Sequence, residues 1–135
     1  MNETIDLMMQ HSSVRNFTDE KIPEHVLKTI VDAGRAAPNW KNFQSYSVIL
    51  VQSQEQKDAI FAQQPQKAIK NCAAFLVFVG DLNRAKIAVE MNGGEFQPEG
   101  VESLLITSVD AAVAGQNTLL AAQSLGYGGV MVGLI

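Results

Sequence analysis

The segment Val101–Leu125 constrains the fold more than any other part of this sequence. It runs for up to 25 residues without proline, and its apolar side chains fall on nearly every side of a helix rather than on one stripe. Small residues, mostly alanine, fill the gaps between them. A helix that is apolar all round is a buried helix. Because a chain of 135 residues holds little protein to surround such a helix, we expect burial against a second subunit.

The composition is that of an ordinary globular chain and excludes several functions. A length of 135 residues suits one domain, and 47% apolar with 18% charged residues is typical of a folded protein. The net charge of −4 opposes binding to nucleic acid or to an anionic membrane surface. The lone Cys72 forms no internal disulfide, which is typical of a reducing compartment. We therefore expect a cytoplasmic protein with neither a nucleic-acid nor a membrane partner.

Apolar periodicity predicts an α+β fold, or an α/β fold with a mixed sheet. The run Ala74–Val79 is apolar throughout, which suits a central strand covered on both faces. Gly126 is placed to end the long helix in a left-handed conformation. The expected helices are Thr4–Gln10, Pro23–Ala36, Gln54–Gln63, Gln66–Asn71, Leu82–Met91 and Val101–Leu125. The expected strands are Tyr46–Val51, Ala74–Val79 and a last one that begins over Gly128–Val132.

Conventional catalytic and metal-binding motifs are missing from the sequence. It has no GxSxG elbow, P-loop, CxxC or HExxH, and its acidic residues are scattered. Such a chain is either a binding module or an enzyme whose cofactor carries the chemistry. The densest polar cluster is His11-Ser12-Ser13-Val14-Arg15, whose guanidinium and hydroxyls suit a phosphate. Spacing alone favours a different interpretation, a capped helix end with Arg15 in a surface ion pair.

Four motifs, in order along the chain, resemble the FMN-dependent nitroreductase family. They are His11-Ser-Ser-Val-Arg15-Asn-Phe17-Thr followed by Ile22-Pro, Arg35-Ala-Ala-Pro38-Asn39-Trp40 with Asn42 and Gln44, Ala114-Gly-Gln116-Asn117, and Leu125-Gly126-Tyr-Gly128-Gly129. Each motif is weak alone, but the ordered set covers nearly the whole chain. The His-x-Ser-x-Arg start and the Gln66-Lys67 pair are most similar to the NADPH-dependent nitroreductase and flavin reductase branch.

The resemblance implies a nitroreductase-like mixed central sheet flanked by helices, with the long helix at a homodimer interface that holds FMN. His11, Ser12, Ser13, Val14 and Arg15 would then hold the FMN phosphate and ribityl chain. The resemblance places Asn39, Trp40 and Gln44 against the flavin from the partner subunit, and Gln66 at the edge of the flavin ring. It also implies that Met131, Val132 and Gly133 line the flavin face and offer backbone amides near N5.

The implied activity is that of an FMN-dependent NAD(P)H oxidoreductase. Hydride would pass from NAD(P)H to flavin N5 and then to a nitroaromatic, quinone or flavin acceptor in a ping-pong mechanism. No protein acid or nucleophile is required, and NADPH and NADH stay open as co-substrates. The alternative is a non-catalytic flavin-binding or dimerising fragment of such a protein.

The sequence differs from the family pattern in two ways, and each difference leads to a further expectation. Asn39 and Trp40 stand where the family usually has serine, so the bulky Trp40 would narrow the cleft or stack on substrate. The family is also longer. We expect residues 1–135 to be a nitroreductase-like FMN-binding domain that lacks its C-terminal part, with the basic residues near flavin N1 and O2 lying beyond Ile135.

Overall fold

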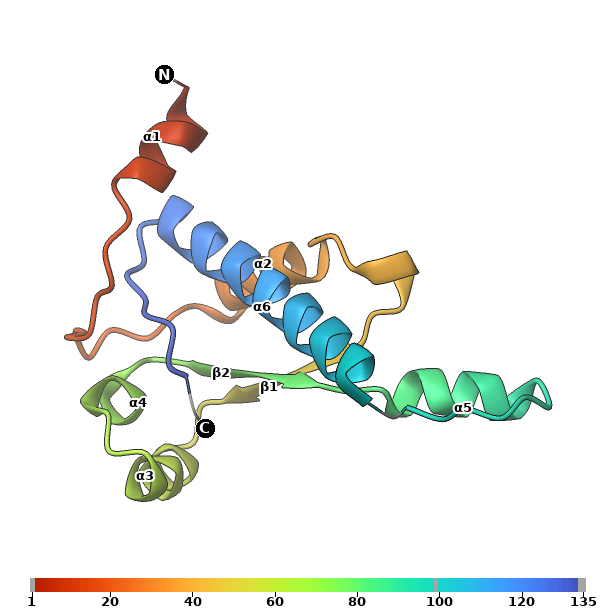
Figure 1. Ribbon diagram of the computed structural model, residues 1–135. Coiled ribbons are helices and arrows are strands. Elements are labelled where there is room, and N and C mark those ends of the chain that lie inside the picture. Colours follow the sequence, from red (N-terminus) through yellow and green to blue (C-terminus); the bar gives the residue numbers. More distant parts are fainter. Residues whose placement is uncertain (1, 99, 134–135) are drawn as a thin grey trace.

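A computed structural model describes residues 2–98 and 100–133 of the chain. Its long helix crosses the molecule beside a two-stranded sheet, and one shorter helix, α5, projects away from the rest (Figure 1). In chain order the elements are α1 (Glu3–Met9), α2 (Glu24–Arg35), the 3₁₀ turn η1 (Trp40–Asn42), β1 (Tyr46–Val51), α3 (Gln54–Gln63), α4 (Lys67–Asn71), β2 (Phe75–Gly80), α5 (Asn83–Met91) and α6 (Gly100–Ser124).

The helices form where apolar periodicity predicts them. The bounds of β1 and α3 match the prediction, and the ends of the other predicted elements that form differ by at most one residue, as helix ends commonly do. Gly126 has φ +86°, which confirms the left-handed residue at the end of α6. The amide of Tyr127 donates to the Ala122 carbonyl at 2.9 Å, so the exposed carbonyls of the last turn find a partner.

The two strands pair antiparallel, from Tyr46 opposite Gly80 to Val51 opposite Phe75. Across residues 2–98 and 100–133, β2 bonds to β1 alone, so this part of the chain holds no parallel pair of the predicted mixed sheet. The side chains of β2 are half-buried up to Phe78 and exposed beyond it. The predicted burial of β2 on both faces is therefore incomplete within the described residues.

The strand predicted to begin over Gly128–Val132 is wrong for the residues described. This segment leaves α6 and runs toward α3 without joining a ladder (Figure 1). The Gly129 carbonyl accepts from the Val14 amide at 3.0 Å, and the Gly133 carbonyl accepts from Gln64 Nε2 at 3.2 Å. These are one backbone bond and one side-chain bond, whereas a strand needs a row of backbone bonds to a neighbouring strand.

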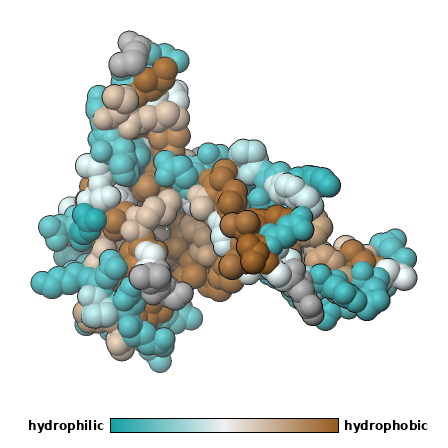
Figure 2. Space-filling view, viewed as in Figure 1, coloured by the Kyte–Doolittle hydropathy of each residue, from teal (hydrophilic) through white to brown (hydrophobic). Residues whose placement is uncertain are grey.

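One protomer covers only one side of α6. The buried residues repeat at helical spacing and face α2 and β2: Thr107, Asp110, Ala111, Ala114, Gly115, Thr118 and Leu119. The opposite side exposes 57% of Leu105 and 56% of Val109, and Leu104, near the start of the helix, is 65% exposed. Figure 2 shows apolar side chains gathered along this helix. The all-round burial predicted for α6 therefore needs a further surface that residues 2–98 and 100–133 do not supply.

By length and composition α6 is also apolar enough to cross a membrane. Core helices of globular proteins meet the same criterion, and α6 packs against α2 and β2. It also carries the carboxyl group of Asp110, which is 3% exposed and accepts two hydrogen bonds from within the chain. These contacts are those of a core helix.

The contact between α2 and α6 depends on the absence of a side chain at Gly34. A Cβ atom at this position would overlap the Thr118 hydroxyl and lie 3.3 Å from the Ala114 carbonyl. The close approach also lets Asn117 Nδ2 donate to the Ala33 carbonyl at 3.3 Å. Leu27 and Ile30 extend the same buried stripe of α2. This contact sets the position of α6 against the rest of the chain.

Gly34→Ala is expected to lower the free energy of unfolding by about 1–3 kcal/mol, because an added methyl group overpacks the α2–α6 contact. The matched control is Gly115→Ala in α6, where the nearest atom to a new Cβ is Met131 Cε at 3.4 Å. There the intrinsic helix preference of alanine, about 1 kcal/mol over glycine, should leave stability unchanged or raised. Urea denaturation followed by circular dichroism measures both, and equal effects in the two variants would contradict the close-packing argument.

Candidate functional site

The loop after α1 is attached to the C-terminal end of α6. His11 Nδ1 lies 2.8 Å from Gln123 Nε2, and the Val14 amide donates to the Gly129 carbonyl at 3.0 Å. Ser12, Ser13 and Arg15 are exposed beside these anchors. The five residues predicted to hold a phosphate therefore lie together on a segment whose backbone position is set by α6 and the chain that follows it.

Arg15 keeps its guanidinium free of carboxylate partners among the described residues. Its Nη1 donates to the Ser13 carbonyl across a long 3.4 Å. The surface ion pair that spacing alone favoured is therefore not formed in this part of the chain. The guanidinium fork and the two neighbouring hydroxyls are available to an anion from outside.

The loop Asn39–Ser45 forms a second polar group, and it is built tightly. Lys41, Asn42 and Gln44 all have positive φ, at 48°, 57° and 51°. The Gln44 amide donates to Asn39 Oδ1 at 3.0 Å, and Gln44 Nε2 donates to Asn42 Oδ1 at 3.2 Å. Trp40 is 41% exposed and meets Phe43 edge-on, with ring centroids 5.7 Å apart. The loop thus presents an indole ring and an amide from a defined backbone shape.

The start of α5 is held beside this loop by Asp81. The Ser47 hydroxyl donates to Asp81 Oδ2, and the Asn83 amide donates to Asp81 Oδ1 at 2.9 Å. These two bonds, with a smaller contribution from the Arg84 charge, lower the pKa of the Asp81 carboxyl. Because α5 begins at this place, Arg84 lies beside the loop, and its Nη1 donates to the Gln44 carbonyl at 3.1 Å.

The structure does not bring the two polar groups together within one chain. The first is tied to α6 at Gln123 and the second at Asp110. At 1.5 Å per helical residue, these two positions lie about 20 Å apart along the helix axis. Figure 1 likewise shows the red-orange N-terminal coil and the golden η1 turn far apart, on the left and right of the view.

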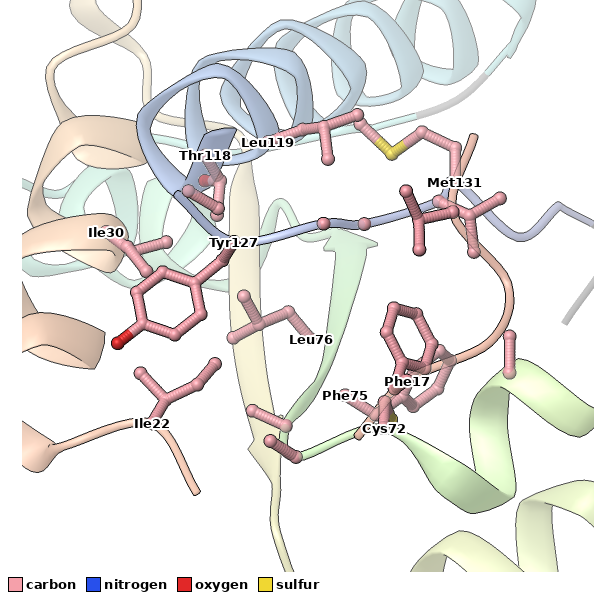
Figure 3. A pocket seen from close by; sticks show the side chains of 18 of the residues that line it. Phe17, Ile22, Ile30, Cys72, Phe75, Leu76, Thr118, Leu119, Tyr127 and Met131 are labelled. Carbon is pink, nitrogen blue, oxygen red and sulfur yellow. The ribbon is translucent and has the colours of Figure 1, made fainter. Parts of the chain in front are cut away.

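An apolar cavity of about 720 Å³ lies between the N-terminal loop, β2 and the segment after α6. Figure 3 shows Met131 and Leu119 above it, Phe17 and Phe75 at one end, and Ile22 and Tyr127 at the other. Of the predicted site residues, Val14, Met131 and Val132 line this cavity. Gly133 does not line it, and its carbonyl accepts from Gln64 Nε2.

Cys72 lines the same cavity, and its thiol is half-buried. Burial raises the pKa of this thiol, and the positive charge of Lys57 partly opposes the increase. Lys57 is itself buried and donates from Nζ to the Cys72 carbonyl at 2.7 Å. A neutral thiol on an apolar wall is the environment of a small apolar residue rather than of a reactive nucleophile.

Gln66 is exposed at the start of α4 and does not line the cavity, so its place at a ring edge stays a prediction. The glutamine whose side chain reaches the segment after α6 is Gln64. Sequence reasoning missed Gln64 and also Gln123, the partner of His11. Neither carries a sequence signal, because each acts through a contact more than sixty positions away in the chain.

The matches to known proteins extend over nearly the whole chain. Residues 8–135 match the model of the nitroreductase family. The chain is 40% identical to FMN reductase [NAD(P)H] of Bacillus subtilis, over 100% of this chain and 55% of that protein. It is 36% identical to NADPH-flavin oxidoreductase of Vibrio harveyi, over 98% of this chain and 54% of that protein. The chain thus spans about half the length of these curated relatives.

A solved structure described as B. megaterium NfrA2 has the same fold. It superposes with a TM-score of 0.92 at 36% identity, over 95% of this chain and 53% of that one. The likeness of fold and the match to the family model cover the same extent of the chain. This protein chain therefore belongs to the nitroreductase family.

Proposed function

We propose that this chain forms the FMN-binding part of an NAD(P)H oxidoreductase. When bound, FMN would supply the hydride chemistry, accepting from NAD(P)H and passing to a nitroaromatic, quinone or flavin acceptor in a ping-pong sequence. The observation that carries the proposal is the exposed cluster Ser12, Ser13 and Arg15, which has no carboxylate partner in the described chain and lies beside an apolar cavity. The relatives named as FMN reductase and NADPH-flavin oxidoreductase support it.

The residues present fit the two chemically different parts of FMN. A phosphate is matched by a guanidinium with two hydroxyls, and residues 11–15 include no acid that would repel it. A planar ring is matched by an apolar surface, which the cavity supplies through Phe17, Met131 and Tyr127. His11 and Val14 hold the phosphate-binding loop in place through Gln123 and Gly129.

The segment after α6 supports the predicted role of its backbone. The amides of Met131, Val132 and Gly133 donate to none of the residues that the structure describes. Such amides are available as hydrogen-bond donors to a ligand, and they are fixed before the ligand arrives. We assign them to the flavin ring, with Met131 and Val132 excluding water from one face.

Two observations support a homodimer with Asn39, Trp40 and Gln44 acting across its interface. The exposed apolar side of α6 needs a cover, and a second copy has the same need. The loop Asn39–Ser45 is also too far along α6 to share a ligand with residues 11–15 of its own chain. Contact from the partner subunit places both groups on one flavin.

The second candidate is a flavin-binding or dimerising unit without turnover. Residues 1–135 span about half the length of the curated relatives they match, so turnover is tested separately from flavin binding. Purified protein distinguishes the two candidates. We expect a yellow protein that oxidises NAD(P)H, followed at 340 nm, when a nitroaromatic acceptor is present. Yellow protein that leaves the absorbance of NAD(P)H at 340 nm unchanged would favour the second candidate. Protein that neither retains nor binds FMN would contradict the proposal.

Arg15→Ala is expected to weaken FMN binding by about 1.5–3 kcal/mol, or roughly tenfold to a hundredfold in Kd, because a charge-assisted contact to phosphate is lost. Arg35→Ala is the matched control, since Arg35 is an exposed arginine that pairs with Asp32 on α2. Titration of FMN fluorescence measures both affinities. Equal affinities for Arg15→Ala and the unmodified chain would leave Arg15 without a role in binding.

Leu105→Glu is expected to shift the protein from dimer to monomer, because it places a charge in the apolar side of α6. Ile49→Glu is the control, since Ile49 is an apolar residue of β1 with a closely similar exposure, 53% against 57% for Leu105. Light scattering after gel filtration measures the mass of each variant. A monomeric unmodified chain at micromolar concentration, or a dimeric Leu105→Glu variant, would contradict this interface.

A further inference from the structure

We propose that Asp110 is a positioning residue that holds the loop Asn39–Ser45 in the shape in which Trp40 and Gln44 face a ligand. The inference rests on the proposed function, because that function assigns the loop to the flavin site. Asp110 itself touches no proposed ligand. It acts from the buried side of α6, through the backbone of the loop and the side chain of Ser45.

Both carboxyl oxygens of Asp110 are used to hold this loop. Oδ1 accepts from the Trp40 amide at 3.1 Å, and Oδ2 accepts from the Ser45 hydroxyl at 2.6 Å. Asp110 is 3% exposed and Ser45 is 1% exposed, so neither bond competes with water. One carboxyl group thus anchors the loop at its start and at its end.

The loop between these anchors adopts a backbone that its residues do not favour. Lys41, Asn42 and Gln44 lie in the left-handed region, where a Cβ atom crowds the backbone. Such conformations persist only where surrounding contacts determine them. The bonds from Asn39 and Asn42 to Gln44 are local and would move with the loop. Restraint from outside the loop comes from Asp110, from the Asp81 amide, which donates to the Ser45 carbonyl at 2.9 Å, and from Arg84, which donates to the Gln44 carbonyl at 3.1 Å.

The restraints from the Asp110 and Arg84 side chains are unequal, because the helices that carry them are packed differently, and the Asp81 bond reaches only the end of the loop at Ser45. α6 is packed against α2 and both strands, whereas α5 has no buried residue and projects from the body (Figure 1). A contact made by a firmly packed helix restrains a loop more than one made by an exposed helix. Asp110 is therefore the anchor that relates the start of the loop, at Trp40, to the core, and it shares the end of the loop, at Ser45, with the Asp81 amide.

A purely structural role for Asp110 would affect stability without a selective effect on the loop. Asp110→Leu removes both acceptors, because it replaces the carboxyl group with an apolar group of similar shape. Asp110→Asn keeps an acceptor for the Trp40 amide and offers a donor to the Ser45 oxygen, so it should rescue the loop. Thr107→Val is the matched control, since Thr107 is also a buried polar residue of α6 but bonds only within its own helix.

Trp40 is the only tryptophan of the chain, so its fluorescence reports on this loop without any bound ligand. In Asp110→Leu we expect stronger acrylamide quenching of Trp40 and faster amide hydrogen exchange across residues 40–45, by about tenfold or more. FMN affinity should fall by a similar factor. Asp110→Asn and Thr107→Val should match the unmodified chain in all three measurements. If Asp110→Leu does not fold, Ser45→Ala removes one anchor alone and should produce a smaller change of the same kind.

Unchanged quenching and exchange in Asp110→Leu, or changes of equal size in Thr107→Val, would overturn the proposal. So would a loosened loop with unaltered FMN affinity, and in that case the proposed function itself stands. If the unmodified chain binds no FMN, the proposed function fails instead, and the Trp40 measurements still decide whether Asp110 holds the loop.

Discussion

The packing of α2 and the two-stranded sheet against one side of α6 is the constraint on which the rest of the structure depends. The helix is continuous from Gly100 to Ser124, so everything attached to it keeps a fixed spacing. Residues 11–15 are attached near its end and the loop Asn39–Ser45 near its middle. The side of α6 that packs internally thus sets the distance between the two polar groups, while its opposite side stays apolar and exposed.

Charge acts differently at long and short range in this molecule. The chain carries a net charge of −4, which repels anions at a distance. Within residues 11–15 there is no acid, and Arg15 is not neutralised by a carboxylate in the described chain. Short-range hydrogen bonding to a phosphate is therefore favoured at this loop although the protein as a whole is acidic.

Sequence patterns predicted the elements of the fold better than the contacts between them. Apolar spacing located α1 and α2, β-rich composition located β1, and a long apolar run without proline located α6, because each of these signals is local. The strand predicted over Gly128–Val132 was wrong, because its apolar composition does not reveal that its carbonyls bond to two separate segments. The site residues came from resemblance to a family, and their contact with a ligand stays a prediction. Asp110 could not be found from the sequence, since its partner Ser45 lies 65 positions away.

The attachment of the N-terminal loop to the end of the chain has a consequence for how the protein is made. His11 bonds to a residue 112 positions later, and Val14 bonds to Gly129. Contacts between such distant segments form slowly, because a long loop must close before they stabilise anything. During synthesis residues 11–15 leave the ribosome more than a hundred residues before Gln123 and Gly129, and until then they lack these partners. Within these 135 residues, a part of the site that is translated early therefore takes its shape late.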